Sequence, residues 1–161
     1  MVPLGFQEAI CSMVGSSIGA NNIALARKIS KLTYIISHSI CLLISVLVFV
    51  FRNTIAHIFT TDEEVQSILL FILVINAILF VPDSAAGILS GTVRALGHQG
   101  KAVKFLLISY WCIGFPVALL CAFKFNMKSP GLWIGCTTSV TFQAMSFLRV
   151  ILQADWQKIA D

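Results

Sequence analysis

Five long apolar segments, separated by short polar connections, constrain the fold of this chain more than any other feature. They cover about residues 2–20, 32–51, 65–96, 102–123 and 131–149. A helix of roughly 20 apolar residues is long enough to cross the hydrocarbon core of a bilayer. Composition agrees, because 58% of the 161 residues are apolar and 11% are charged, whereas soluble domains carry about 25% charged residues. We therefore predict an all-α, polytopic membrane helix bundle with five transmembrane helices in a lipid bilayer.

The basic residues are unevenly divided between the two ends of the predicted helices. One end would carry Arg27, Lys28, Lys31, Arg94, Lys101, Lys104, Arg149 and Lys158, and the other Arg52, Lys124 and Lys128. Cytoplasmic loops carry an excess of Lys and Arg, so we expect the larger group and the C-terminus to be cytoplasmic. The net charge of +4 does not indicate nucleic acid as a partner, because these cations cluster at helix ends. Met1 would then lie outside without a signal peptide, which suggests the tail of a longer protein.

A stripe of polar and small residues runs along the third segment. At about 100° per residue, four residues of a helix lie within about 40° of the direction of Asn76: Asp83, Gly87, Ser90 and Arg94. Arg94 would lie roughly 16 Å further along the helix axis than Asp83, so Asp83 needs another partner: a group on another helix, a cation, water or a proton. Pro82 removes a backbone donor beside Asp83, which predicts a kink or local opening. An ionisable group inside a membrane span is a functional-site candidate.

A second carboxylate, Glu8, lies in the first segment on a face of small residues. Gly15 and Gly19 on that face have a spacing that lets another helix approach closely, so we expect this face to be packed inside the bundle. Gly131 and Gly135 form a similar pair in the fifth segment. Apolar surroundings disfavour the charged form of a carboxyl group, so Glu8 and Asp83 are candidates to exchange a proton or bind Na⁺ during transport. The alternative for both is a structural hydrogen bond to a neighbouring helix; function is favoured for Asp83 and open for Glu8.

Three further positions predict local structure. Thr61 should cap the helix that follows it, with Glu64 closing a capping box, which makes the acids of this turn structural. His38 in the second segment is expected near the interface, hydrogen-bonded to a neighbour. Pro116 in the fourth segment is tolerated where neighbouring groups satisfy the freed carbonyl.

The common signatures of enzymes and metal sites are missing from the sequence. It contains no Gly-rich phosphate loop, no HExxH and no GxSxG motif. The five cysteines lie inside apolar segments without a metal-binding spacing. We therefore expect a protein that is not an enzyme and uses no cofactor and no metal.

Three blocks of sequence resemble the C-terminal part of the multidrug and toxic compound extrusion (MATE) family, eukaryotic branch. Residues 5–28, with Gly5-Phe6, Val14-Gly15 and Ala26-Arg27-Lys28, resemble the eighth helix of the family and its basic loop. Asp83 followed by GILSG at 87–91, then Arg94, Gly97 and Gln99, resembles the tenth helix and is the most specific block. Gly114-Phe115-Pro116 with GLWIG at 131–135 resembles the eleventh and twelfth helices, and Asp155-Trp156 with Lys158 resembles the exit sequence.

The resemblance implies a cation-coupled antiporter that uses H⁺ or Na⁺ to export small organic or xenobiotic compounds. Such transporters have twelve helices in two lobes, of which this chain would supply helices eight to twelve. Asp83 would be the coupling acid of the tenth helix, whereas the acid of the seventh helix would precede Met1. Glu8 stands where many members have a small or apolar residue. The remaining roles implied are polar contacts near the cavity for Asn76, Ser90 and Gln99, hinges at Pro82 and Pro116, and helix packing at Gly15, Gly19, Gly87, Gly91, Gly131 and Gly135.

Five helices cannot build a cavity between two lobes, so we do not expect this chain to transport alone. Its expected partners are a missing N-terminal lobe or partner helices, and a small organic substrate in the intact transporter. The alternative is a non-transporting membrane subunit, or a degenerate copy, that packs through its Gly, Ser and Ala faces against another protein.

Overall fold

The computed structural model describes residues 2–157, and these residues form helices joined by short turns. Met1 and Lys158, two positions used in the orientation prediction, lie outside the described residues. The elements in order are α1 (Val2–Gly19), α2 (Ile23–Val50), α3 (Arg52–Phe59), α4 (Glu63–Ala95), α5 (Gln99–Leu107), a π-helical segment (Ile108–Gly114), α6 (Phe115–Leu119), a second π-helical segment (Leu120–Lys124) and α7 (Lys128–Gln153). Residues 2–157 contain no β-strand, which confirms the all-α prediction.

Three of the helical rods are long and apolar enough to cross a membrane: α2, α4 and the continuous stretch Gln99–Lys124. Helices α1 and α7 cover the first and fifth predicted segments, but within residues 2–157 only those three rods meet both conditions. The polar residues of α1 and α7 lower their mean hydropathy. Helix α2 begins earlier than expected because Asn22 caps it, accepting a hydrogen bond from the backbone N–H of Leu25 at 3.1 Å. The basic stretch 24–31 is therefore the first part of α2.

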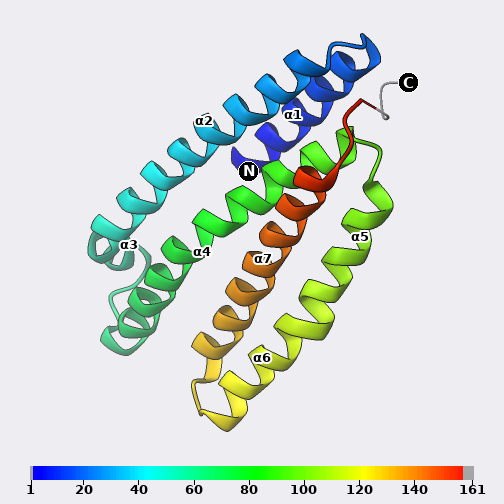
Figure 1. Cartoon of the computed structure of the whole chain (residues 1–161). Coiled ribbons are helices and arrows are strands. Elements are labelled where there is room, and N and C mark those ends of the chain that lie inside the picture. The colour runs from blue at the N-terminus through cyan, green and yellow to red at the C-terminus, as the bar shows by residue number, and fades with distance from the viewer. Residues whose placement is uncertain (1, 158–161) are drawn as a thin grey trace.

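Helix α4 lies at the centre of the bundle and packs against α1, α2 and α7. Figure 1 shows α1 and α2 on one side of it, and α7 on the other. Beyond α7 lies the continuous stretch Gln99–Lys124, which we call the α5–α6 rod. The α1–α2 turn, the α4–α5 turn and the end of α7 lie together at one end of the bundle, which we call the basic end. The described basic residues of these elements are Arg27, Lys28, Lys31, Arg94, Lys101, Lys104 and Arg149.

The main apolar core lies near the basic end, where α1, α2, α4 and the residues after α7 meet. Its buried side chains are Ile10, Val14, Ile18, Ala26, Ile88, Leu96 and Trp156. Many large apolar side chains elsewhere face outward, for example Leu43 of α2 at 60% exposure and Trp111 at 67%. An apolar surface of this extent needs lipid or a protein partner to cover it.

The glycines of α4 and α7 lie at close helix contacts. A Cβ added at Gly91 would lie 2.5 Å from the carbonyl oxygen of Gln7, and one at Gly131 would lie 2.5 Å from the backbone nitrogen of Ala122. At Gly135 it would collide with Ala118. These three glycines therefore allow α4 to approach α1, and α7 to approach the α6 rod.

The glycine face of α1 differs from the prediction. A Cβ added at Gly15 or Gly19 would meet nothing within 4 Å, so no described helix packs closely on these two glycines. Helix α1 instead buries the face that carries Ile10, Val14 and Ile18. Large apolar side chains remove more apolar surface from the surroundings than glycines do, which explains why they turn toward the core.

One local prediction, the cap of α4, is corrected by the structure. Asp62, not Thr61, caps α4: its Oδ1 accepts from the backbone N–H groups of Glu64 at 2.9 Å and Val65 at 3.3 Å. Helix α4 starts one residue after this cap, so Thr61 lies outside it. Helix α4 is continuous through Pro82, and the kink or local opening expected there stays a prediction.

Pro116 is accommodated differently, within the rod that follows α5. It lies in the first turn of α6, directly after the first π-helical segment. The backbone N–H of Phe115 donates to the carbonyl of Tyr110, five residues back. The wider π turn takes up the proline without ending the rod.

Candidate functional site

Asp83 lines a pocket of about 380 Å³ whose wall is built by residues of five elements. Its polar lining residues are Gln7 of α1, Asp83 and Ser90 of α4, Tyr110 of the first π-helical segment, and Gln143 of α7. Apolar residues complete the wall, among them Phe80 and Leu106. We call this site the Asp83 pocket. It places one carboxyl group among amide and hydroxyl groups on an otherwise apolar bundle.

The carboxylate of Asp83 has no partner of its own in the described chain. Within residues 2–157, none of the hydrogen bonds or ion pairs involves its side chain. Gln143 is only 7% exposed, and its amide offers both a donor and an acceptor. A carboxylate with neutral polar neighbours and no fixed cation can take up a proton or hold a small hard cation with oxygen ligands.

Glu8, the second predicted carboxylate, has a different environment. Its Oε1 accepts from Nη2 of Arg94 at 2.9 Å, and the two side chains are 69% and 33% exposed. Helices α1 and α4 run in the same direction (Figure 1), which brings Glu8 level with the last turns of α4. Arg94 therefore forms its ion pair with Glu8, whereas Asp83 has no charged partner among the described residues.

The residues of the predicted polar stripe on α4 lie in different surroundings. Gly87 and Ser90 line the same pocket as Asp83. Asn76 lies outside this lining and donates to the carbonyl of Ile72 in its own helix at 3.3 Å. Gln99, the first residue of α5, is exposed and also lies outside the pocket. The residues of the stripe are spread along α4, and different parts of α4 contact different helices. Residues on one face of α4 therefore do not all line the Asp83 pocket.

The two predicted hinge prolines also lie outside the Asp83 pocket. Pro82 borders an apolar groove with Ser45 of α2 and Thr141 of α7. In the same region, the Ser45 hydroxyl donates to the carbonyl of Ala77 at 2.5 Å, which holds α2 against α4. Pro116 is exposed on the α6 rod.

Three pocket residues were not predicted from the sequence: Gln7, Tyr110 and Gln143. These residues carry no charge and come from three other elements, so neither the ionisable groups nor the shared face of α4 pointed to them. The one available signal was their polarity within apolar segments.

Ser84 follows Asp83 directly but contacts helix α2 and does not line the Asp83 pocket. Its Oγ lies 3.3 Å from Nδ1 of His38. His38 stacks on Tyr34 with ring centroids 5.4 Å apart.

The described residues contain no group of three or more His, Cys, Asp or Glu side chains that could hold a metal ion.

Comparison with known proteins gives a consistent result across sequence and structure. The sequence model of the MatE family matches residues 1–120. Multidrug and toxin extrusion protein 2 of Mus musculus is 33% identical over 162 residues, which is 100% of this chain and 28% of that protein. Multidrug and toxin extrusion protein 1 of Danio rerio is 32% identical over 98% of this chain and 27% of its own length. The eukaryotic MATE transporter AtDTX14 superposes with a TM-score of 0.92 at 28% identity, covering 98% of this chain and 35% of that one.

Proposed function

This chain belongs to the MatE family, and from that membership we propose that it forms part of a cation-coupled antiporter. The intact protein would export small organic or xenobiotic compounds across a membrane in exchange for H⁺ or Na⁺. The observation that carries the proposal is Asp83: a carboxyl group in a pocket on an apolar helix, with no charged partner in the described chain. Such a group can bind and release a cation without first breaking an ion pair.

The chain spans about 28% of the length of the mouse relative. We propose that its five predicted membrane helices correspond to helices eight to twelve of a twelve-helix transporter, with α4 as the tenth. The remaining helices would supply the other lobe, and the substrate would bind between the lobes. The likeness to AtDTX14 over 98% of this chain supports this assignment. We further propose that the basic end and the C-terminus face the cytoplasm, because Lys and Arg are enriched on that side of membranes.

We assign coupling to Asp83 rather than to Glu8. The Glu8 carboxylate is already engaged by Arg94 at 2.9 Å, so protonating it would require the loss of that pair. The residues that line the pocket beside Asp83 are neutral, so no charged side chain among them competes with the coupling cation. Ser90 and Gln143 can form hydrogen bonds with the cation-bound and with the cation-free carboxyl group. Glu8 and Arg94 would instead connect α1 to the end of α4.

A chimera tests the proposal with this chain in a complete transporter. In it, the chain replaces the matching segment of the Mus musculus protein. Reconstituted vesicles receive a pH gradient or, separately, a Na⁺ gradient, and the export of a fluorescent organic cation is followed. We expect gradient-driven export by the chimera, and export at the level of empty vesicles for Asp83→Asn. Glu8→Gln is the matched control, because it also removes one carboxylate, and it should retain most of the export.

Each outcome has a defined meaning. The gradient that drives export identifies the coupling ion. Unchanged export by Asp83→Asn, with the variant inserted at normal levels, would contradict the coupling role of Asp83. Equal loss in the Glu8→Gln chimera would assign coupling to both carboxylates. A chimera that inserts stably but exports under neither gradient would favour the alternative, a membrane subunit that acts by helix packing.

A further inference from the structure

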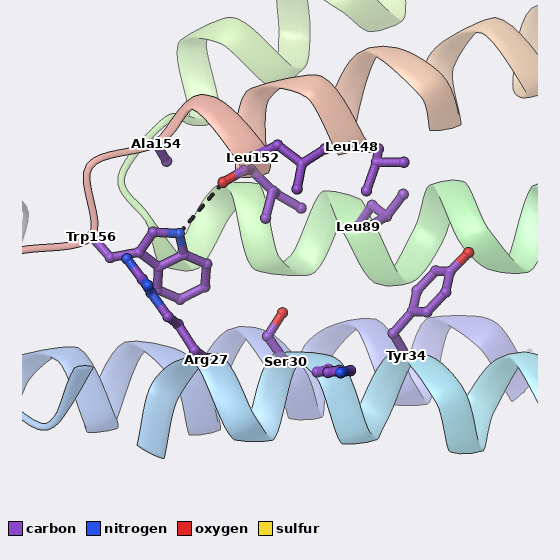
Figure 2. A pocket seen from close by; sticks show the side chains of 10 residues that line it. Arg27, Ser30, Tyr34, Leu89, Leu148, Leu152, Ala154 and Trp156 are labelled. Atoms are coloured by element: carbon purple, nitrogen blue, oxygen red, sulfur yellow. Dashed lines mark hydrogen bonds between the residues drawn. The ribbon is translucent and has the colours of Figure 1, made fainter. Parts of the chain in front are cut away.

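A second pocket, distinct from the Asp83 pocket, opens between α2 and α7 at the basic end. It has a volume of about 460 Å³. Figure 2 shows Arg27, Ser30 and Tyr34 on one side, Leu148 and Leu152 on the other, and Leu89 of α4 between them. Ser30 contacts Thr92 of α4, with 3.3 Å between the two hydroxyl oxygens. Helix α4 therefore forms the floor of a groove whose two walls are α2 and α7.

Charge and apolar surface are separated along this groove. Arg27 and Lys31 lie four residues apart on α2, which puts them on one face of the helix. Both side chains are exposed and line the groove. No carboxylate is among the described side chains that line it. The apolar part lies one to two turns further from the basic end, where Leu89 and Leu148 face Tyr34.

The Arg27 side chain at the basic end of the groove is held in place by a contact with another element. The Arg27 guanidinium lies 5.7 Å from the centroid of the Trp156 ring. Trp156 is only 5% exposed, and its Nε1 donates to the carbonyl of Ile151 at 3.4 Å. Figure 2 shows this indole closing the groove at the basic end. A guanidinium that stacks on an aromatic ring still presents its N–H donors to an anion.

We propose that this groove binds one anionic phospholipid. Its phosphate would lie on Arg27 and Lys31, and one acyl chain would run along Leu89, Leu148 and Leu152. The order of groups matches such a molecule, because two cations at the end of the bundle continue directly into an apolar surface. A free phosphate would leave the apolar wall unused, and a neutral apolar compound would leave the two cations unused. Basic pockets between membrane helices bind anionic headgroups in this way. The site does not depend on transport activity.

Trp156 provides a local probe for the test. The chain has three tryptophans, so Trp111→Phe with Trp133→Phe leaves Trp156 as the one source of tryptophan fluorescence. The full chain is placed in phosphatidylcholine vesicles that contain a small fraction of lipid with brominated acyl chains, which quench only on contact. The brominated lipid is either phosphatidylglycerol or phosphatidylcholine. We expect phosphatidylglycerol to quench Trp156 at a lower mole fraction than phosphatidylcholine does.

Charge variants show whether the two cations carry the preference. Lys31→Gln leaves the Arg27–Trp156 contact intact and should weaken the preference about five-fold, and adding Arg27→Gln should weaken it by about another five-fold. Lys101→Gln with Lys104→Gln is the matched control, because both lysines are exposed near the same end on α5 and do not line the groove. Quenching is expressed relative to each variant without brominated lipid, and circular dichroism verifies the helix content.

Three results would overturn the proposal. The first is equal quenching by both lipids. The second is an equal loss of preference in the α5 control. The third is loss of the preference when inorganic phosphate is added at an ionic strength matched with chloride, which would identify a site for free phosphate instead of a lipid.

Discussion

At the residue scale, Gly91 of α4 lies in a tight helix contact, whereas Gly15 of the neighbouring α1 lies beside open space. A Cβ at Gly91 would meet the Gln7 carbonyl oxygen at 2.5 Å, and one at Gly15 would meet nothing within 4 Å. Both positions are helical, so the difference lies in the neighbour and not in the backbone. The sequence pattern marked both as packing positions.

We predict opposite effects of alanine at these two glycines. Gly91→Ala should lower the free energy of unfolding by about 1–3 kcal/mol, because the new methyl group overpacks the α1–α4 contact. Gly15→Ala should raise it by up to about 1 kcal/mol, because alanine favours the helix and fills open space. Unfolding of the detergent-solubilised chain, followed by circular dichroism, measures both. A loss of similar size at both positions would mean that another helix covers Gly15.

The two carboxylates also differ at this scale. Sequence reasoning identified Asp83 and Glu8 from their residue type and apolar surroundings alone. It also excluded Arg94 as the partner of Asp83 from the helix rise. It could not assign Arg94 to Glu8, because that pair connects residues 86 positions apart and depends on how α1 lies along α4.

Helix starts are decided at the scale of the element. The stretch Thr61 to Glu64 was recognised from the sequence as the start of α4, and α4 does begin there. The choice of Asp62 over Thr61 depends on where the first turn closes. Both residue types are good caps, so the sequence alone did not distinguish them. Thr60 adds a further contact, accepting a hydrogen bond from the backbone N–H of Asp62 at 3.2 Å.

We predict that Asp62→Ala destabilises α4 by about 1 kcal/mol, because two backbone N–H groups lose their acceptor. Thr61→Ala should change the free energy of unfolding by less than about 0.5 kcal/mol, because no cap bond is lost there. Hydrogen exchange of the first turn of α4 in the purified chain measures this locally. Faster exchange in Thr61→Ala than in Asp62→Ala would contradict the assignment of the cap.

The α5–α6 rod shows a second effect at this scale. Proline within an apolar segment predicts either a break or a compensated helix, and the sequence left the kind of compensation open. The structure uses π turns on both sides of α6. Gly114 packs closely against Ser139 of α7, and Gly135 of α7 packs closely against Ala118, which holds this rod on α7. The backbone geometry there follows from tertiary packing as well as from Pro116.

At the scale of the whole molecule, the arrangement of the helix ends makes a direct prediction about topology. Cysteines introduced at Lys28 and Lys101 should react with a membrane-impermeant thiol reagent from one side of the membrane. Cysteines at Asn53 and Lys124 should react from the opposite side, because Asn53 lies in α3 just after the end of α2 and Lys124 ends the α5–α6 rod. Labelling is measured in sealed vesicles in a background in which the native cysteines are replaced by alanine. Labelling of Lys28→Cys and Asn53→Cys from the same side would exclude α2 as a complete span.

The sequence by itself determined the properties that depend on local composition and on the length of single segments. The apolar runs required helices suited to a membrane, and the spacing around Asp83 indicated both the family and the central candidate residue. Only the tertiary structure decided which residues meet. It brought Gln7, Tyr110 and Gln143 to Asp83 from three other elements, paired Glu8 with Arg94, and formed the groove between α2 and α7. The physical reason is that helix formation is set by neighbours along the chain, whereas these contacts depend on the direction, depth and rotation of helices that are far apart in the sequence.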